Sequence, residues 1–234
     1  MLRNLVPILL MIGGALVGVA QAAQLLVIDA ENAAYPPGTL LKSDEAVQLG
    51  AGAHITLLAP DGNTIRIKGP FKGVAGRHAA GGNERAMMIL SSLLGGKGDS
   101  TAALGAIRFP EAASRAARLP APELIGVAES GDRCVYRNDA VLWREDAGHE
   151  SRLTIDDRDH HPRTLPWPAG AQRLALPAAD FQDGRRYLLS LDGKQIDIWV
   201  HKPGRRNLNP AELAAWMAEN SCLSQVFALV EGMK

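Results

Sequence analysis

Short runs in which apolar and polar residues alternate, each ended by turn residues, recur along this chain of 234 residues. In the clearest pair, the runs 54–59 and 64–69 flank a turn that contains Asp61-Gly62, and isoleucines alternate with basic residues in the second run. Two such runs around an Asp-Gly turn are a strong signal for a β-hairpin. We expect the isoleucines to face a core and the basic side chains to face solvent.

The second half of the chain continues this pattern and predicts a β-sandwich. A hairpin is expected from 133–136 and 140–144, and another from 187–191 and 195–201 around Asp192-Gly193. The runs 153–155 and 173–176 add further short strands. Short strands at this spacing, with turn residues between them, are typical of a sandwich.

Helical periodicity appears twice. Residues 83–94 carry apolar residues at helical spacing, with Asn83 as N-cap and Gly95 as the end signal. The tail 209–230 begins with a capping-box pattern and carries an apolar stripe, with a break near Asn220. We expect this stripe to pack on the sheet of the second half.

The first 22 residues have the layout of a secretory signal peptide. A basic residue precedes an apolar stretch of about 15 residues, and Ala20-Gln21-Ala22 supplies the small residues at a cleavage site. The stretch is shorter than the roughly 20 residues that span a bilayer. We therefore expect a periplasmic or secreted protein with no permanent membrane span. An uncleaved anchor helix is the alternative.

The chain contains two cysteines, Cys134 and Cys222. In an oxidising compartment such a pair is most simply a disulfide, whereas two buried free thiols are the alternative. No nearby Cys/His pair completes a set of four zinc ligands.

Three segments within 40–73, namely 49–58 (LGAGAHITLL), 60–62 (PDG) and 69–73 (GPFKG), resemble the β-rich domain of FecR-like exported bacterial proteins. The segment 100–108 (STAALGAIR) also resembles one that such proteins carry after that domain. The resemblance covers about the first half of the mature chain. It implies a ligand-less β-sandwich or β-solenoid-like module outside the inner membrane, used for sensing or protein contacts. The family has no catalytic motif, so the resemblance transfers no functional residue.

The predicted fold class is mainly β with a C-terminal helical segment. The expected organisation is a signal peptide (1–22), a FecR-like β domain with one helix (23–109), a linker (110–122) and a β-sandwich-like domain with C-terminal helices (123–234).

Without Arg3 the chain has 24 basic and 25 acidic side chains. This balance argues against non-specific binding of nucleic acid, which requires a basic surface.

A cluster of acidic residues and histidines is the densest group of candidate ligands. Carboxylate oxygens and imidazole nitrogens both suit divalent cations. The spacing matches neither an EF-hand loop nor a zinc-binding helix, so a turn-forming loop ended by Pro162 is the alternative. The predicted ligands are Asp156, Asp157, Asp159, His160 and His161.

All four tryptophans lie in the second half of the chain. Trp199 lies within a predicted strand and Trp216 on the helical stripe, so both are expected in the core. Trp167 stands between two prolines and is predicted to be exposed as part of a contact surface. Tryptophans on a sandwich can form a sugar-stacking platform or a peptide groove.

Catalytic patterns are missing from the sequence, which contains neither Gly-x-Ser-x-Gly nor a phosphate-binding Gly-x-x-x-x-Gly-Lys-Ser/Thr. The sequence therefore predicts a non-catalytic binding, interaction or sensing module of the cell envelope, without a cofactor, whose partner is another envelope protein. A metal or small-ligand binder using the Asp/His loop is one alternative. The other is a carbohydrate-active or other hydrolase, in which paired carboxylates act as acid and base.

Overall fold

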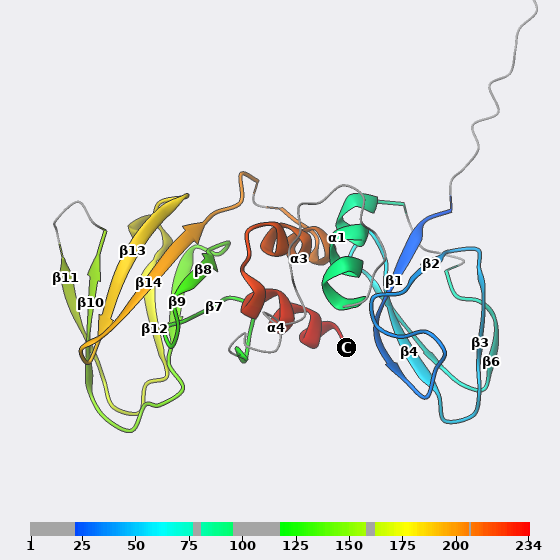
Figure 1. Cartoon of the computed structure of the whole chain (residues 1–234), viewed down its shortest axis with the longest axis horizontal. Coiled ribbons are helices and arrows are strands. Elements are labelled where there is room, and N and C mark those ends of the chain that lie inside the picture. Colours follow the sequence, from blue (N-terminus) through cyan, green and yellow to red (C-terminus); the bar gives the residue numbers. More distant parts are fainter. Residues whose placement is uncertain (1–21, 77–80, 96–117, 158–161, 206) are drawn as a thin grey trace, which may run out of the picture.

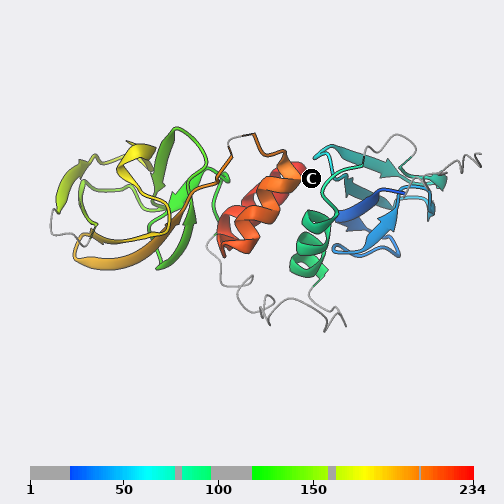
Figure 2. The same cartoon turned by 90° about the horizontal axis from the view of Figure 1, so that it is seen from above.

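A computed structural model describes residues 22–76, 81–95, 118–157, 162–205 and 207–234. Three parts follow one another along the long axis: an N-terminal β module, a helical layer and a β-sandwich (Figures 1 and 2). The predicted signal peptide, apart from Ala22, lies outside the described residues. So do the first eight residues of the predicted linker and the segment 100–108 that resembles FecR-like proteins.

The N-terminal β module contains a four-stranded antiparallel sheet and a two-stranded one. The larger sheet has the order β2 (Leu40–Lys42), β1 (Gln24–Glu31), β4 (His54–Leu58) and β5 (Thr64–Lys68). The smaller sheet pairs β3 (Ala46–Leu49) with β6 (Phe71–Val74). The predicted hairpin is present as β4 and β5, with Ile67 buried and its neighbours Arg66 and Lys68 exposed.

Strand β1 is buried on both faces, which explains its continuous apolar run. Leu25 and Val27 pack between the two sheets of the module. Leu26 and Ile28 point to the other face and pack against the helices, together with Leu58 of β4. This second apolar face therefore needs a cover that the module's own strands do not supply.

The helical layer consists of α1 (Glu84–Gly95), α3 (Pro210–Glu219) and α4 (Leu223–Met233). Asn83 Oδ1 accepts a hydrogen bond from the backbone of Ala86 at 3.2 Å, as the predicted N-cap requires. The predicted capping box is present at α3, where Asn209 and Glu212 exchange hydrogen bonds.

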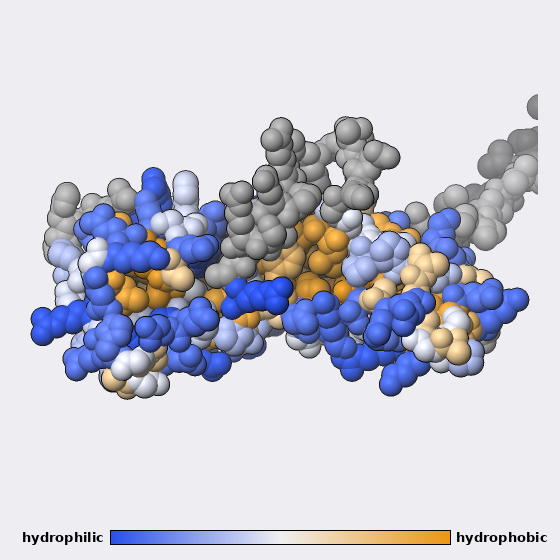
Figure 3. Space-filling model, turned by 60° about the horizontal axis from the view of Figure 1, so that its bottom comes forward, coloured by the Kyte–Doolittle hydropathy of each residue, from blue (hydrophilic) through white to orange (hydrophobic). Residues whose placement is uncertain are grey.

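The predicted packing of the tail on the second sheet is only partly right, because α4 contacts β8 of that sheet whereas α3 packs against α1. Ala214, Met217 and Val226 of these helices belong to the same buried cluster as Leu26 and Met87. The helical layer therefore lies between the two β parts and contacts both of them. Figure 3 shows apolar surface in the middle of the molecule, between the two β parts.

The sandwich places a five-stranded sheet against a three-stranded one, with one apolar cluster between them. A single-turn 3-10 helix, η1 (Ala178–Asp180), follows the smaller sheet. The larger sheet has the order β11 (Arg163–Trp167), β10 (Ser151–Asp156), β13 (Arg185–Leu191), β14 (Lys194–His201) and β8 (Gly131–Cys134), and the smaller has β12 (Arg173–Pro177), β9 (Asp139–Trp143) and β7 (Leu124–Gly126).

One of the two hairpins expected in the sandwich is present. Strands β13 and β14 pair around Asp192 and Gly193, whose φ angles of 50° and 83° place both in the left-handed region that a two-residue turn uses. The hairpin predicted from 133–136 and 140–144 is wrong. Strand β8 pairs in parallel with β14, whereas β9 pairs with β12 and β7 in the opposite sheet. Two strands that are adjacent in sequence thus belong to different sheets.

Within the described ranges, the helices are all too short or too polar to cross a lipid bilayer.

Candidate binding surface

The structure reverses the expected positions of two tryptophans. Trp167 is fully buried, with 0% of its surface exposed, so its predicted role in a contact surface is wrong. Successive side chains of a strand point to opposite faces, and on β11 the inward position belongs to Trp167. Its Nε1 donates a hydrogen bond to the carbonyl of Ala171 at 2.8 Å, and the Arg144 guanidinium lies 5.0 Å from the ring centre.

Trp199, in contrast, is 46% exposed, although it was expected in the core. On β14 the alternation places Ile198 and Val200 in the sandwich core, and Trp199 and His201 on the outer face of the five-stranded sheet. The alternation of inward and outward positions along this strand could have predicted the exposure of Trp199 from the sequence. Ile196, Ile198 and Val200 already occupy the inward positions, so Trp199 has the outward one.

Trp199 is the centre of a group of outward side chains that we call the Trp199 face. Across the sheet, Trp199 lies in register with Arg186 of β13 and with Asp132 of β8. Along its own strand, its ring and that of His201 are nearly parallel, with 10° between planes and 6.3 Å between centroids. The face consists of Asp132, Arg186, Asp197, Trp199 and His201.

A histidine–aspartate hydrogen bond and an arginine–aspartate ion pair hold the polar members of the Trp199 face in place. His201 Nε2 lies 2.7 Å from Asp132 Oδ1, and Arg186 Nη2 forms an ion pair with Asp197 Oδ2. Partly exposed pairs of this kind contribute little to stability. Their effect here is geometric, because they orient two carboxylates and a guanidinium on either side of the indole ring.

Arg133 fixes strand β8, which forms the edge of the Trp199 face. Its guanidinium donates to the backbone carbonyls of Gly126 at 3.1 Å, Asp132 at 2.8 Å and Glu129. Burial lowers the pKa of Arg133, although the charges of Asp132 and Glu129 act in the opposite direction. The arginine thus ties the edge strand to β7 and to the turn before β8.

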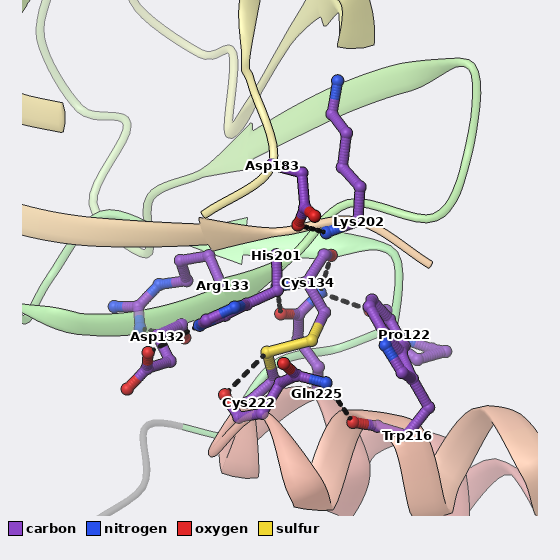
Figure 4. Close-up of a disulfide and its surroundings, with 11 residues drawn as sticks. Pro122, Asp132, Arg133, Cys134, Asp183, His201, Lys202, Trp216, Cys222 and Gln225 are labelled. Carbon is purple, nitrogen blue, oxygen red and sulfur yellow. Dashed lines mark hydrogen bonds and ion pairs between the residues drawn. A yellow bond between two sulfur atoms is a disulfide. The ribbon is translucent and has the colours of Figure 1, made fainter. Parts of the chain in front are cut away.

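A disulfide and a buried glutamine connect β8 to the helical layer (Figure 4). The sulfurs of Cys134 and Cys222 lie at disulfide distance, 2.06 Å, as the predicted pairing requires. Gln225 of α4 accepts a hydrogen bond from the Cys134 amide at 2.7 Å and donates to the Cys134 carbonyl at 2.8 Å. Its amide nitrogen also donates to the carbonyl of Pro122 at 2.9 Å. The glutamine therefore pairs with Cys134 as a neighbouring strand would.

The predicted metal loop is only partly within the described residues. Asp156 ends strand β10 and Asp157 follows it, whereas Asp159, His160 and His161 lie outside the described residues. Among the residues that the structure does describe, no three potential ligands are grouped closely enough to hold a metal ion. Metal binding at this loop stays a prediction.

A groove of about 530 Å³ lies between α1, α3 and the segment that leads into α3. Its lining includes Ile89 and Trp216, the latter half-buried. Two glutamates also line it, and each is paired with an arginine: Glu219 with Arg85 at 3.0 Å, and Glu212 with Arg205 at 2.7 Å. Glu212 is also part of the helix cap, so the groove is built from groups that already serve the fold.

No known protein-family model matches this sequence, and no curated protein is significantly similar to it.

Proposed function

We propose that this chain is a non-catalytic binding protein of the bacterial cell envelope, and that the Trp199 face is its contact surface. The observation that carries the proposal is the exposed indole of Trp199, which is 46% accessible and lies in register with the charged residues Asp132 and Arg186 on its two sides. These two side chains are themselves held by His201 and Asp197 respectively. Such preorganisation is typical of a binding site because little side-chain freedom is lost when a ligand binds.

The proposed compartment has three supports. The leader has the layout of a secretory signal. The Cys134–Cys222 pair is at bonding distance, and disulfides persist in oxidising compartments. The FecR-like pattern within 40–73 resembles exported proteins that serve in sensing or protein contacts. We therefore propose that the mature protein works in the periplasm or outside the cell.

Photo-crosslinking in living cells tests the proposal. A benzoylphenylalanine in place of Gln195, on the outer face of β14, reports what contacts this face. The matched control replaces Ala175, which is exposed on β12 of the opposite sheet. We expect an adduct from Gln195 that disappears when Trp199→Ala is added, and no adduct from Ala175. Equal labelling at both positions, or at neither, would refute the Trp199 face as the contact surface.

A further inference from the structure

We infer that the ligand of the Trp199 face is an uncharged oligosaccharide; this inference rests on the proposed function of the same surface. A pyranose ring has an apolar face of C–H groups and a rim of hydroxyls. A matching site offers a flat aromatic surface with hydrogen-bonding groups beside it. The Trp199 ring supplies the first of these, since it is apolar, rigid and 46% exposed.

The second requirement is met on both sides of the ring. Asp132 and Arg186 are the direct cross-strand neighbours of Trp199, at the spacing of about 5 Å that paired strands provide. A carboxylate accepts hydrogen bonds from two adjacent hydroxyls, and a guanidinium donates to two. Because both groups are held in pairs, to His201 and Asp197 respectively, their positions are set before a ligand arrives.

The charges of the Trp199 face decide against other ligand classes. Two carboxylates, Asp132 and Asp197, stand against the single guanidinium of Arg186, which disfavours phosphates, nucleic acids and anionic sugars. The centre of a protein interface is usually depleted in charged residues. Here, Asp132 and Arg186 flank the tryptophan on the neighbouring strands and Asp197 and His201 flank it along its own strand, with Leu188 opposite Asp197 on the same face. This arrangement suits a polyhydroxylated ligand better than an apolar protein surface.

The second ring limits how a sugar can lie on the indole. His201 lies two residues from Trp199 on the same strand, and the two rings are stacked, with 10° between their planes and 6.3 Å between their centroids. A sugar would therefore pack on the indole face that points away from His201. Asp132 and Arg186 lie on opposite sides of the indole, about 10 Å apart across three strands, so a chain of sugars rather than a single unit reaches both.

Isothermal titration calorimetry with cellotetraose and tetra-N-acetylchitotetraose tests the inference on the mature, oxidised protein. We expect saturable binding of at least one of the two tetrasaccharides, and a glucose monomer should bind at least tenfold more weakly. Trp199→Ala should weaken binding by tenfold or more, Trp199→Phe less, and Asp132→Asn several-fold. The control is Met88→Ala, which removes the other large exposed apolar side chain among the described residues, 52% accessible on α1, and should leave binding unchanged.

Circular dichroism of each variant checks that the sandwich is folded. Binding that is unaffected by Trp199→Ala overturns the inference. So does the absence of binding to the unmodified protein at millimolar tetrasaccharide. If in that case the Gln195 crosslinker still yields a Trp199-dependent protein adduct, the contact surface stands and its ligand is a protein. If the crosslinker yields no adduct either, the proposed function fails together with the inference.

Discussion

Replacing Gln225 with alanine should destabilise the protein more than any other single change of a polar side chain at the junction of sandwich and helices. The side chain is 1% exposed and makes three hydrogen bonds to backbone groups, two to Cys134 and one to Pro122. A hydrogen bond contributes about 1 kcal/mol net, and a buried partner left without one adds a desolvation penalty. The free energy of unfolding should therefore fall by about 3 kcal/mol.

Urea unfolding of the oxidised protein, followed by circular dichroism, measures this loss. The midpoint should fall while the slope stays constant, since the exposed area hardly changes. The control is Gln172→Ala, at an exposed glutamine whose Nε2 donates one hydrogen bond to the Glu145 carbonyl at 3.0 Å. That variant should lose less than about 0.5 kcal/mol. If Gln225→Ala is no less stable than the control, Gln225 does not join the two parts.

Three further changes have defined outcomes. Replacing Cys134 and Cys222 with serine removes a link across 88 residues, and should lower the free energy of unfolding by about 4–5 kcal/mol, as measured by urea midpoints; an unchanged midpoint contradicts this. Trp167→Ala should cost about 3–5 kcal/mol, because it opens a cavity in the sandwich core, and a thermal midpoint within 2 °C of the wild type would show that the core repacks. A hydrogen bond from Ser151 is the largest of the effects that lower the pKa of Asp192, so the charged form favours folding above the ordinary pKa and this contribution is lost as pH falls through the lowered value. Asp192→Asn should flatten the acid side of the stability profile, and a profile parallel to that of the wild type would exclude this role.

Local signals in the sequence predicted local structure well. The Asp61-Gly62 and Asp192-Gly193 turns lie where hairpins form, because Gly62 and both residues of the second turn adopt the positive φ angles that such turns require. Asn209 caps α3, as its spacing to Glu212 indicated. Each of these interactions joins residues a few positions apart, so the sequence contains all of the information that they require.

Of the members of the Trp199 face, the sequence pointed to none as a contact residue, and chose Trp167 instead. The prolines beside Trp167 suggested exposure, but the alternation of β11 turns the ring inward. Asp132 and Arg186 join Trp199 only because β8 and β13 are its neighbours in the sheet. Strand β8 is more than 60 residues away from β14 in sequence, and no local pattern identifies such a partner.

By itself, the sequence determined the hairpins at its two Asp-Gly turns and the capped helices, and it supplied the two cysteines of the predicted disulfide. The tertiary structure alone decided which apolar surface each segment covers. The tail helices join the apolar cluster of α1 and β1 because β1 leaves an apolar face open there, whereas the inner faces of the sandwich sheets already pack against each other. Apolar burial has no preferred direction and depends on area. The apolar stripe of the tail helices can therefore pack on any uncovered apolar face, and only the complete fold shows which face is uncovered.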